Sequence, residues 1–202
     1  MNPQSGMNAS GCFWMLRIIF RNRQQQTRWN LLTILQTPSI FSLIDAMMMT
    51  PIEIQNLLAE AVAEENKGEF LNALRKYRDV YAASPHDQEA ILGLARVALT
   101  MGELEYAFDF FVKLLIENHR HPWGFWGRAV VYFAYQQPER AFREVCRAIE
   151  YDSPATSLRV DCAVLLNENG YYQEALDALH NLSEDDFDED AKIEWCYAEI
   201  ML

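Results

Sequence analysis

The feature that most constrains this chain is an internal repeat with a period of 34 residues. The segment Gly68–Ala73 is followed at this spacing by three segments of similar character, with no insertion between the copies. These segments begin at Gly102, Gln136 and Gly170. A unit of this length cannot bury its apolar face alone, so the copies must stack on one another. The repeat therefore predicts an array of stacked units.

Each unit has the pattern of two helices joined by a tight turn. Alanine recurs once on each helix, and large apolar residues recur at the helical spacing of three and four. The recurring positions are Ala61, Ala95, Ala129 and Ala163; Ala73, Ala107, Ala141 and Ala175; Tyr77, Phe111, Val145 and Leu179; and Val80, Leu114, Ala148 and Leu182. We expect the alanines to let helix axes approach closely and the large side chains to fill the space between neighbouring pairs.

The turn between the two helices is marked by glycine in three of the four copies. Glycine supplies the left-handed conformation that ends a helix. Gln136 replaces it once, and Pro138 then stands near the start of the next helix, where proline is favoured.

Together these columns resemble the tetratricopeptide repeat. The resemblance implies an all-α fold, a right-handed α-solenoid of antiparallel helix pairs. It places four units at about 54–87, 88–121, 122–155 and 156–189, within residues 50–189. His119 and Ser153 depart from the family, because they stand where a proline usually ends the unit. Residues 190–202 are expected to form a capping helix or the start of a truncated fifth unit.

The charge divides the chain in two. Residues 1–49 carry a net charge of +3, whereas residues 50–202 contain 13 basic and 28 acidic residues, a net charge of −15. The basic leader has three interpretations: a targeting segment, a weak signal peptide or membrane anchor, or an extension upstream of a true start among Met47, Met48 and Met49. It contains no run of 18 apolar residues, which weakens the anchor. We expect a cytoplasmic protein, with organelle targeting or membrane association through residues 1–49 as the alternatives.

The chain offers little sign of catalysis. Its four cysteines (Cys12, Cys146, Cys162 and Cys196) form no CxxC pair, and the pair His119 and His121 lacks further ligands nearby. Phosphate-binding loops and the common hydrolase motifs are also missing from the sequence. We therefore predict a protein that is not an enzyme and takes no cofactor and no metal.

The resemblance implies a concave wall lined by the first helix of each unit, which would grip a peptide. The candidate groove residues are Leu92, Arg96, Leu99, Trp123, Trp126, Val130, Phe133 and Asn167. The third unit stands out because three of its positions are aromatic, and such residues are common at binding hot spots. The opposing hypothesis is that these aromatics are core between units two and four. A third possibility is that residues 29–44 fold back into the groove.

The expected partner is a protein or peptide segment of apolar or basic character. Some members of the family bind the acidic tails of Hsp70 and Hsp90 through Lys, Asn and Arg on the first helices. The matching positions here are Leu58, Val62, Gly93, Trp123 and Gly127, and a shift by one unit does not supply the clamp either. A negative array would also repel such a tail. Binding of nucleic acid through a broad basic surface is disfavoured for the same reason.

The resulting functional hypothesis is a protein-interaction scaffold or chaperone-like adaptor. Two alternatives stay open. The array is the recognition module of a larger enzyme cut off at residue 202, or it belongs to a membrane-tethered assembly factor.

Overall fold

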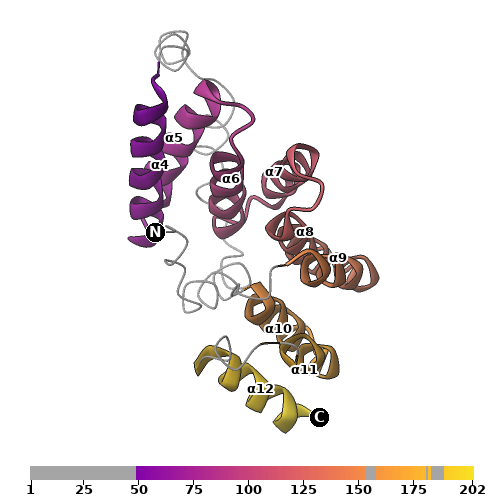
Figure 1. Cartoon of the computed structure of the whole chain (residues 1–202). Coiled ribbons are helices and arrows are strands. Elements are labelled where there is room, and N and C mark those ends of the chain that lie inside the picture. Colours follow the sequence, from indigo (N-terminus) through magenta and orange to yellow (C-terminus); the bar gives the residue numbers. More distant parts are fainter. Residues whose placement is uncertain (1–48, 153–157, 181, 183–188) are drawn as a thin grey trace. The chain divides into compact units, whose positions relative to one another are not determined.

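The computed structural model describes residues 49–152, 158–180, 182 and 189–202. These residues form nine α-helices and no strand, which confirms the all-α fold class for the described chain (Figure 1). The helices are α4 (Pro51–Asn66), α5 (Phe70–Ala83), α6 (Gln88–Thr100), α7 (Leu104–Glu117), α8 (Pro122–Ala134), α9 (Pro138–Tyr151), α10 (Leu158–Glu168), α11 (Tyr172–His180) and α12 (Glu189–Met201).

Some predictions fall on residues that the structure does not describe. The leader up to residue 48 and the departure at residue 153 lie outside the described residues. Among the helices that are described, none combines the length and the apolar character needed to cross a bilayer.

The described chain begins with a capping box at the start of α4. The Thr50 hydroxyl accepts a hydrogen bond from the Glu53 amide, and the Glu53 carboxylate accepts one from the Thr50 amide. Pro51 occupies the first helical turn, where a missing N–H costs nothing. Together these residues fix the helix start.

The predicted turns are present in every helix pair. The second helices begin 34 residues apart, at Phe70, Leu104, Pro138 and Tyr172. Each pair turns through a left-handed residue, and the positions with their φ angles are Gly68 (80°), Gly102 (79°), Gln136 (58°) and Gly170 (83°). After α6, for example, the Gly102 amide donates to the Leu99 carbonyl, and the Glu103 amide donates to the Ala98 carbonyl. This is the Schellman arrangement, which satisfies carbonyls left open at a helix end.

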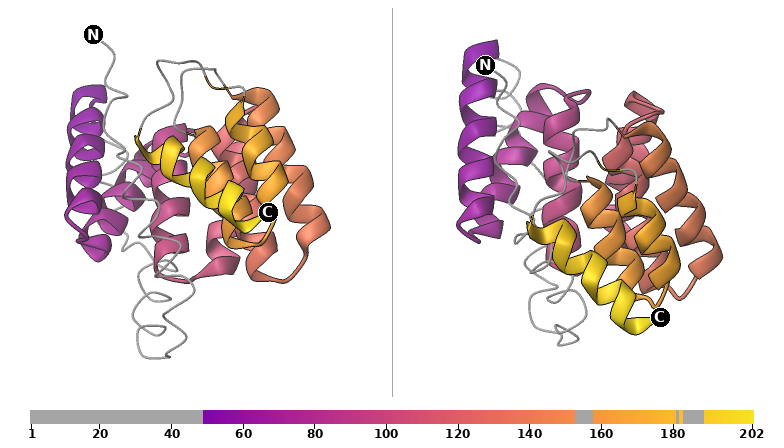
Figure 2. Two further views of the ribbon diagram at one scale, coloured as in Figure 1. Left: turned by 90° about the horizontal axis from the view of Figure 1, so that it is seen from below. Right: turned by 60° about the horizontal axis from the view of Figure 1, so that its bottom comes forward.

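The chain forms two compact units, divided between His119 and Arg120. In the first, α4 pairs with α5 and α6 pairs with α7, and α6 packs against α5 and α4. In the second, α8 pairs with α9 and α10 pairs with α11, and α10 packs against α8 and α9. The last helix, α12, packs on α10 and α11 (Figure 2).

The alanine columns lie at the contacts between helices, as predicted. All eight alanines of the two columns are fully buried, and the large apolar column from Tyr77 to Leu179 is equally buried. At Gly93 of α6 there is no room for a side chain, because an added Cβ would lie 2.4 Å from the Tyr77 ring of α5. Small residues at these points therefore set the distance between helices.

We predict that Gln136→Gly stabilises the protein by about 0.5–1 kcal/mol. Gln136 is exposed and has a left-handed backbone conformation. This conformation costs free energy for a residue with a Cβ, whereas glycine adopts it without that steric cost. Urea unfolding followed by circular dichroism measures the change. The matched control is Gly102→Ala, which should destabilise by about the same amount, because open space surrounds an added Cβ there and only the backbone is strained. Equal stabilities for Gln136→Gly and the unchanged protein would contradict the argument.

Candidate functional site

The eight predicted groove residues lie on three of the first helices of the pairs. Helix α6 carries Leu92, Arg96 and Leu99 in the first compact unit, and α8 and α10 carry the others in the second. Leu92 and Trp123 are half-buried. The six buried positions are Arg96, Leu99, Trp126, Val130, Phe133 and Asn167. The role of these residues in binding stays a prediction.

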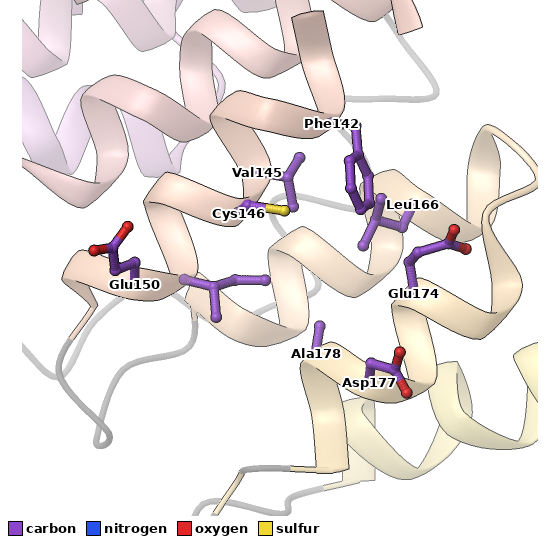
Figure 3. Close-up of a pocket in the computed structure, with 9 residues that line it drawn as sticks. Phe142, Val145, Cys146, Glu150, Leu166, Glu174, Asp177 and Ala178 are labelled. Atoms are coloured by element: carbon purple, nitrogen blue, oxygen red, sulfur yellow. The ribbon is translucent and has the colours of Figure 1, made fainter. Parts of the chain in front are cut away.

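The described lining of a cavity of about 400 Å³ in the second compact unit includes none of these positions. Its described lining comes from α9, α10 and α11 and contains Phe142, Val145, Cys146, Ile149, Glu150, Leu166, Glu174, Asp177 and Ala178 (Figure 3). Most of these residues belong to second helices, whose outer faces the sequence analysis did not consider. An available signal was the apolar spacing of three and four from Phe142 to Ile149 on α9.

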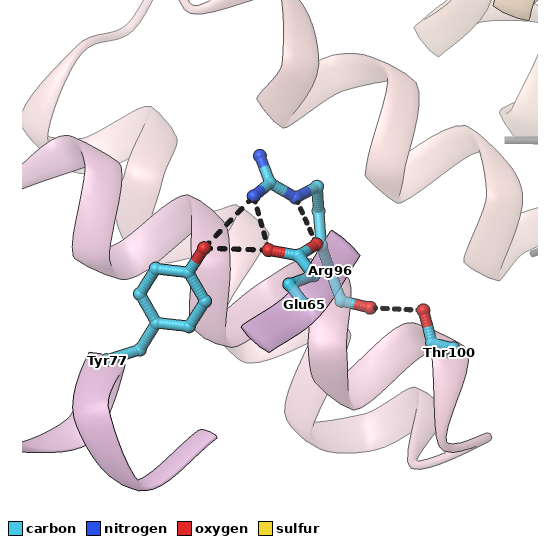
Figure 4. Close-up of polar contacts among 4 residues, drawn as sticks. All are labelled: Glu65, Tyr77, Arg96 and Thr100. Atoms are coloured by element: carbon cyan, nitrogen blue, oxygen red, sulfur yellow. Dashed lines mark hydrogen bonds and ion pairs between the residues drawn. The ribbon is translucent and has the colours of Figure 1, made fainter. Parts of the chain in front are cut away.

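In the first compact unit, Arg96 belongs to a buried polar cluster (Figure 4). Its guanidinium binds both carboxylate oxygens of Glu65, with Nε–Oε1 at 2.9 Å and Nη2–Oε2 at 2.7 Å. The Tyr77 hydroxyl donates to Glu65 Oε2 at 2.7 Å and accepts from Arg96 Nη2 at 3.3 Å. The Thr100 hydroxyl donates to the Arg96 carbonyl. Sequence reasoning placed Arg96 on the groove but did not find Glu65 as its partner.

The cluster joins three helices in a protected environment. The side chains of Arg96 and Glu65 are 11% and 8% exposed, and burial together with the Glu65 charge raises the pKa of Tyr77. A phenol in this setting stays protonated and keeps donating its hydrogen bond. Because the guanidinium is held by a bidentate carboxylate, Glu65 already balances the charge of Arg96.

We predict that Arg96→Ala destabilises the protein by about 3–5 kcal/mol, because it leaves the Glu65 carboxylate buried without its partner. The double variant Glu65→Ala with Arg96→Ala should lose less than the single variant. The measurement is a double-mutant cycle by urea unfolding. Strictly additive losses would show that the two side chains do not interact in solution.

In the second compact unit, α8 carries a dense aromatic cluster. Trp123 and Trp126 pack edge to face, with ring centroids 5.4 Å apart. The ring centroids of Phe133 and Tyr171 lie 5.8 Å apart, and Tyr171 stacks on Phe142 of α9. Phe133 and the almost fully buried Trp126 therefore have packing roles within this unit, whereas half-buried Trp123 keeps aromatic surface toward solvent. The Trp126 indole N–H has no acceptor among the described residues.

The predicted residue on α10, Asn167, connects this helix to the last helix. Its amide donates to the Glu194 carboxylate at 2.8 Å and to the Glu194 carbonyl at 3.1 Å. Both side chains are buried, and burial raises the pKa of Glu194 even though the Asn167 hydrogen bond opposes the shift. Sequence reasoning missed Glu194, because nothing in the repeat indicated where α12 would pack.

We predict that Glu194→Gln stabilises the protein at pH 7 and leaves its stability unchanged near pH 4. A carboxyl whose pKa is raised above its ordinary 4.5 contributes stability at low pH, which is lost as the pH rises through the raised value. Glutamine keeps an acceptor for Asn167 and carries no charge. The free energy of unfolding, measured by urea at both pH values, tests the prediction. Glu199→Gln on the exposed face of α12 is the matched control and should have little effect at either pH.

The described residues contain no cluster of three or more His, Cys, Asp or Glu side chains suited to a metal ion. Cys146, Cys162 and Cys196 are free thiols. Burial raises the pKa of Cys162 well above its ordinary value, so this thiol stays protonated and unreactive. His121 precedes α8, and burial lowers its pKa.

Comparison with known proteins shows the fold. No family model and no curated protein matches the sequence. Among solved structures, a thermophilic tetratricopeptide repeat protein of Thermus thermophilus is 18% identical with a TM-score of 0.64, over 78% of this chain and 87% of that one. A tetratricopeptide repeat protein of Parabacteroides merdae is 18% identical with a TM-score of 0.57, over 95% of this chain and 73% of that one. The chain therefore has the tetratricopeptide repeat fold, which confirms the resemblance and the helical solenoid class.

Proposed function

We propose that this chain is a protein-interaction scaffold that binds a segment of a partner protein on the first helices of its repeats. The observation that carries the proposal is the half-buried Trp123, which packs edge to face on the almost fully buried Trp126 at the start of α8. A tryptophan with one supported side and one accessible side is the kind of residue that dominates binding energy at interfaces.

The contact of Trp123 with Trp126 lowers the conformational entropy that Trp123 would lose on binding a ligand. An indole that already rests on a neighbouring ring loses little conformational freedom when a ligand covers it. Trp126, held in the interior of the unit, fixes that resting position. In the other compact unit, considered by itself, α6 carries half-buried Leu92, and its Arg96 is held by Glu65.

The charge of the array favours an apolar or basic partner segment. Residues 50–202 carry a net charge of −15, which attracts cationic segments and repels acidic ones. An acidic Hsp70 or Hsp90 tail and nucleic acid are therefore disfavoured ligands. The expected cytoplasmic localisation stays a prediction, as does the absence of a cofactor and of enzymatic activity.

We predict that Trp123→Ala weakens capture of the partner by at least about tenfold, in line with the loss of a hot-spot tryptophan. The measurement is a pull-down with the tagged full chain, quantified by mass spectrometry. Tyr197→Ala is the matched control, because Tyr197 is also a surface aromatic that packs edge to face on a neighbour, Tyr172, but lies on α12. Equal capture by Trp123→Ala and the unchanged chain would exclude this surface as the site.

Trp126→Ala separates binding from folding. Removing this buried indole should destabilise the chain by about 3–5 kcal/mol. Circular dichroism and urea unfolding should show that loss, whereas Trp123→Ala should keep its helicity. If Trp123→Ala lost as much stability as Trp126→Ala, Trp123 would be a core residue and the site assignment would fail.

A further inference from the structure

The cavity of the second compact unit has an apolar floor. Helix α9 contributes Phe142, Val145 and Ile149, and α10 contributes Leu166. Of these, Val145 and Leu166 are buried and the other two are half-buried. The volume of about 400 Å³ lies within the range of sites that hold a ligand group. The cavity therefore offers room and apolar surface for one or two large side chains.

The cavity opens to solvent beside carboxylates. Cys146, Glu150 and Asp177 of the lining are exposed, and Glu174 is half-buried. In Figure 3, Glu174 and Asp177 extend from α11 on the side of the cavity opposite α9. The described lining holds three carboxylates and no cationic side chain. An apolar ligand that enters here passes a negatively charged rim.

The arginines of α9 do not neutralise the carboxylates at the rim of the cavity. Arg147 interacts with Glu144 and lies over the Phe125 ring, and Arg140 interacts with Gln137 and lies near the Tyr132 ring. Arg143 is exposed on the same helix but does not line the cavity. Residues 120–202 contain 7 basic and 16 acidic residues, so the wider field has the same sign.

We propose that this cavity, between the second helices α9 and α11, is a second docking site for a protein segment in which a large apolar side chain is flanked by lysine or arginine. The apolar side chain fills the space above Leu166, and the flanking cations pair with Glu174 and Asp177. The site lies mainly on the second helices, and its described first-helix residue, Leu166 of α10, is not used by the proposed function. Either site can therefore fail without the other.

Binding of short fluorescent peptides to the full chain tests the proposal. The probe is a synthetic peptide in which Leu-Phe is flanked on each side by Lys-Lys. One comparison peptide has Glu in place of each Lys, and another has Ala-Ala in place of Leu-Phe. Fluorescence anisotropy should show binding of the first peptide alone, and the affinity should fall as salt is raised toward about 1 M, where charges are screened within ~3 Å. Equal binding of all three peptides, or of none, overturns the proposal.

Two variants locate the bound peptide. Glu174→Gln with Asp177→Asn removes two charges at nearly constant shape and should weaken binding by about 3–10-fold, the combined effect of two partly exposed ion pairs. The matched control is Glu139→Gln with Glu199→Gln, which removes two exposed carboxylates outside the cavity and should change the affinity less than about twofold. Equal losses in both would indicate attraction to the overall charge and would overturn the assignment.

Cys146→Trp tests the floor independently of charge. The larger side chain at this exposed lining position should fill the cavity and abolish binding, while circular dichroism stays unchanged. Undiminished binding by a folded Cys146→Trp variant overturns the proposal. Analytical sedimentation of the unchanged chain and of Cys146→Trp tests an alternative occupant. If the unchanged chain forms a stable dimer, Cys146→Trp dissociates it, and no peptide binds, then the cavity holds a second copy of the chain and the proposal is overturned.

Discussion

The close approach of helices through alanine is the constraint on which the rest of this structure depends. Eight alanines, one on each helix of the four pairs, are fully buried. At Gly93 there is no room even for a Cβ, because the Tyr77 ring lies against the backbone. Larger residues at these points would push the axes apart and open voids elsewhere, because interiors are close-packed. The 34-residue period keeps every such contact in phase, so an insertion of even one residue within a helix would rotate the alanine away from its partner.

In the last three pairs this packing gives the two helices different surfaces, because the first helix buries more of its residues than the second. Helices α6 and α10 contact neighbours on several sides, and most of their residues are buried, including polar ones such as Arg96 and Asn167. The second helix α9 buries only four residues and keeps a broad outer face. Surface for binding therefore remains at partly open first-helix positions such as Trp123, and in the spaces between second helices. The two proposed sites occupy these two kinds of surface.

The sequence predicted the parts of the structure that recur and could not predict the parts that occur once. The alanine columns, the left-handed turns and even the exception at Gln136 follow from local spacing, because backbone conformation and helix faces depend on neighbouring residues. The partners of Arg96 and Asn167 lie 31 and 27 residues away on other helices, so they depend on packing geometry.

Spacing assigns a residue to a helix face, but a helix inside an array has more than one covered face. For this reason several expected groove positions, such as Leu99, are buried. The capping box at Thr50 was readable from the sequence and was overlooked.

The buried polar pairs supply what the repeat itself lacks. Alanine columns are nearly interchangeable between units, so they stabilise a wrong pairing of helices almost as well as the right one. Glu65 with Arg96 joins α4 to α6, and Asn167 with Glu194 joins α10 to α12. A shifted pairing would satisfy the alanines but leave a charged or amide group buried without a partner, which costs several kcal/mol. These pairs therefore disfavour alternative registers. The raised pKa of Glu194 is in keeping with the cost of burying a carboxylate, because burial is its main cause.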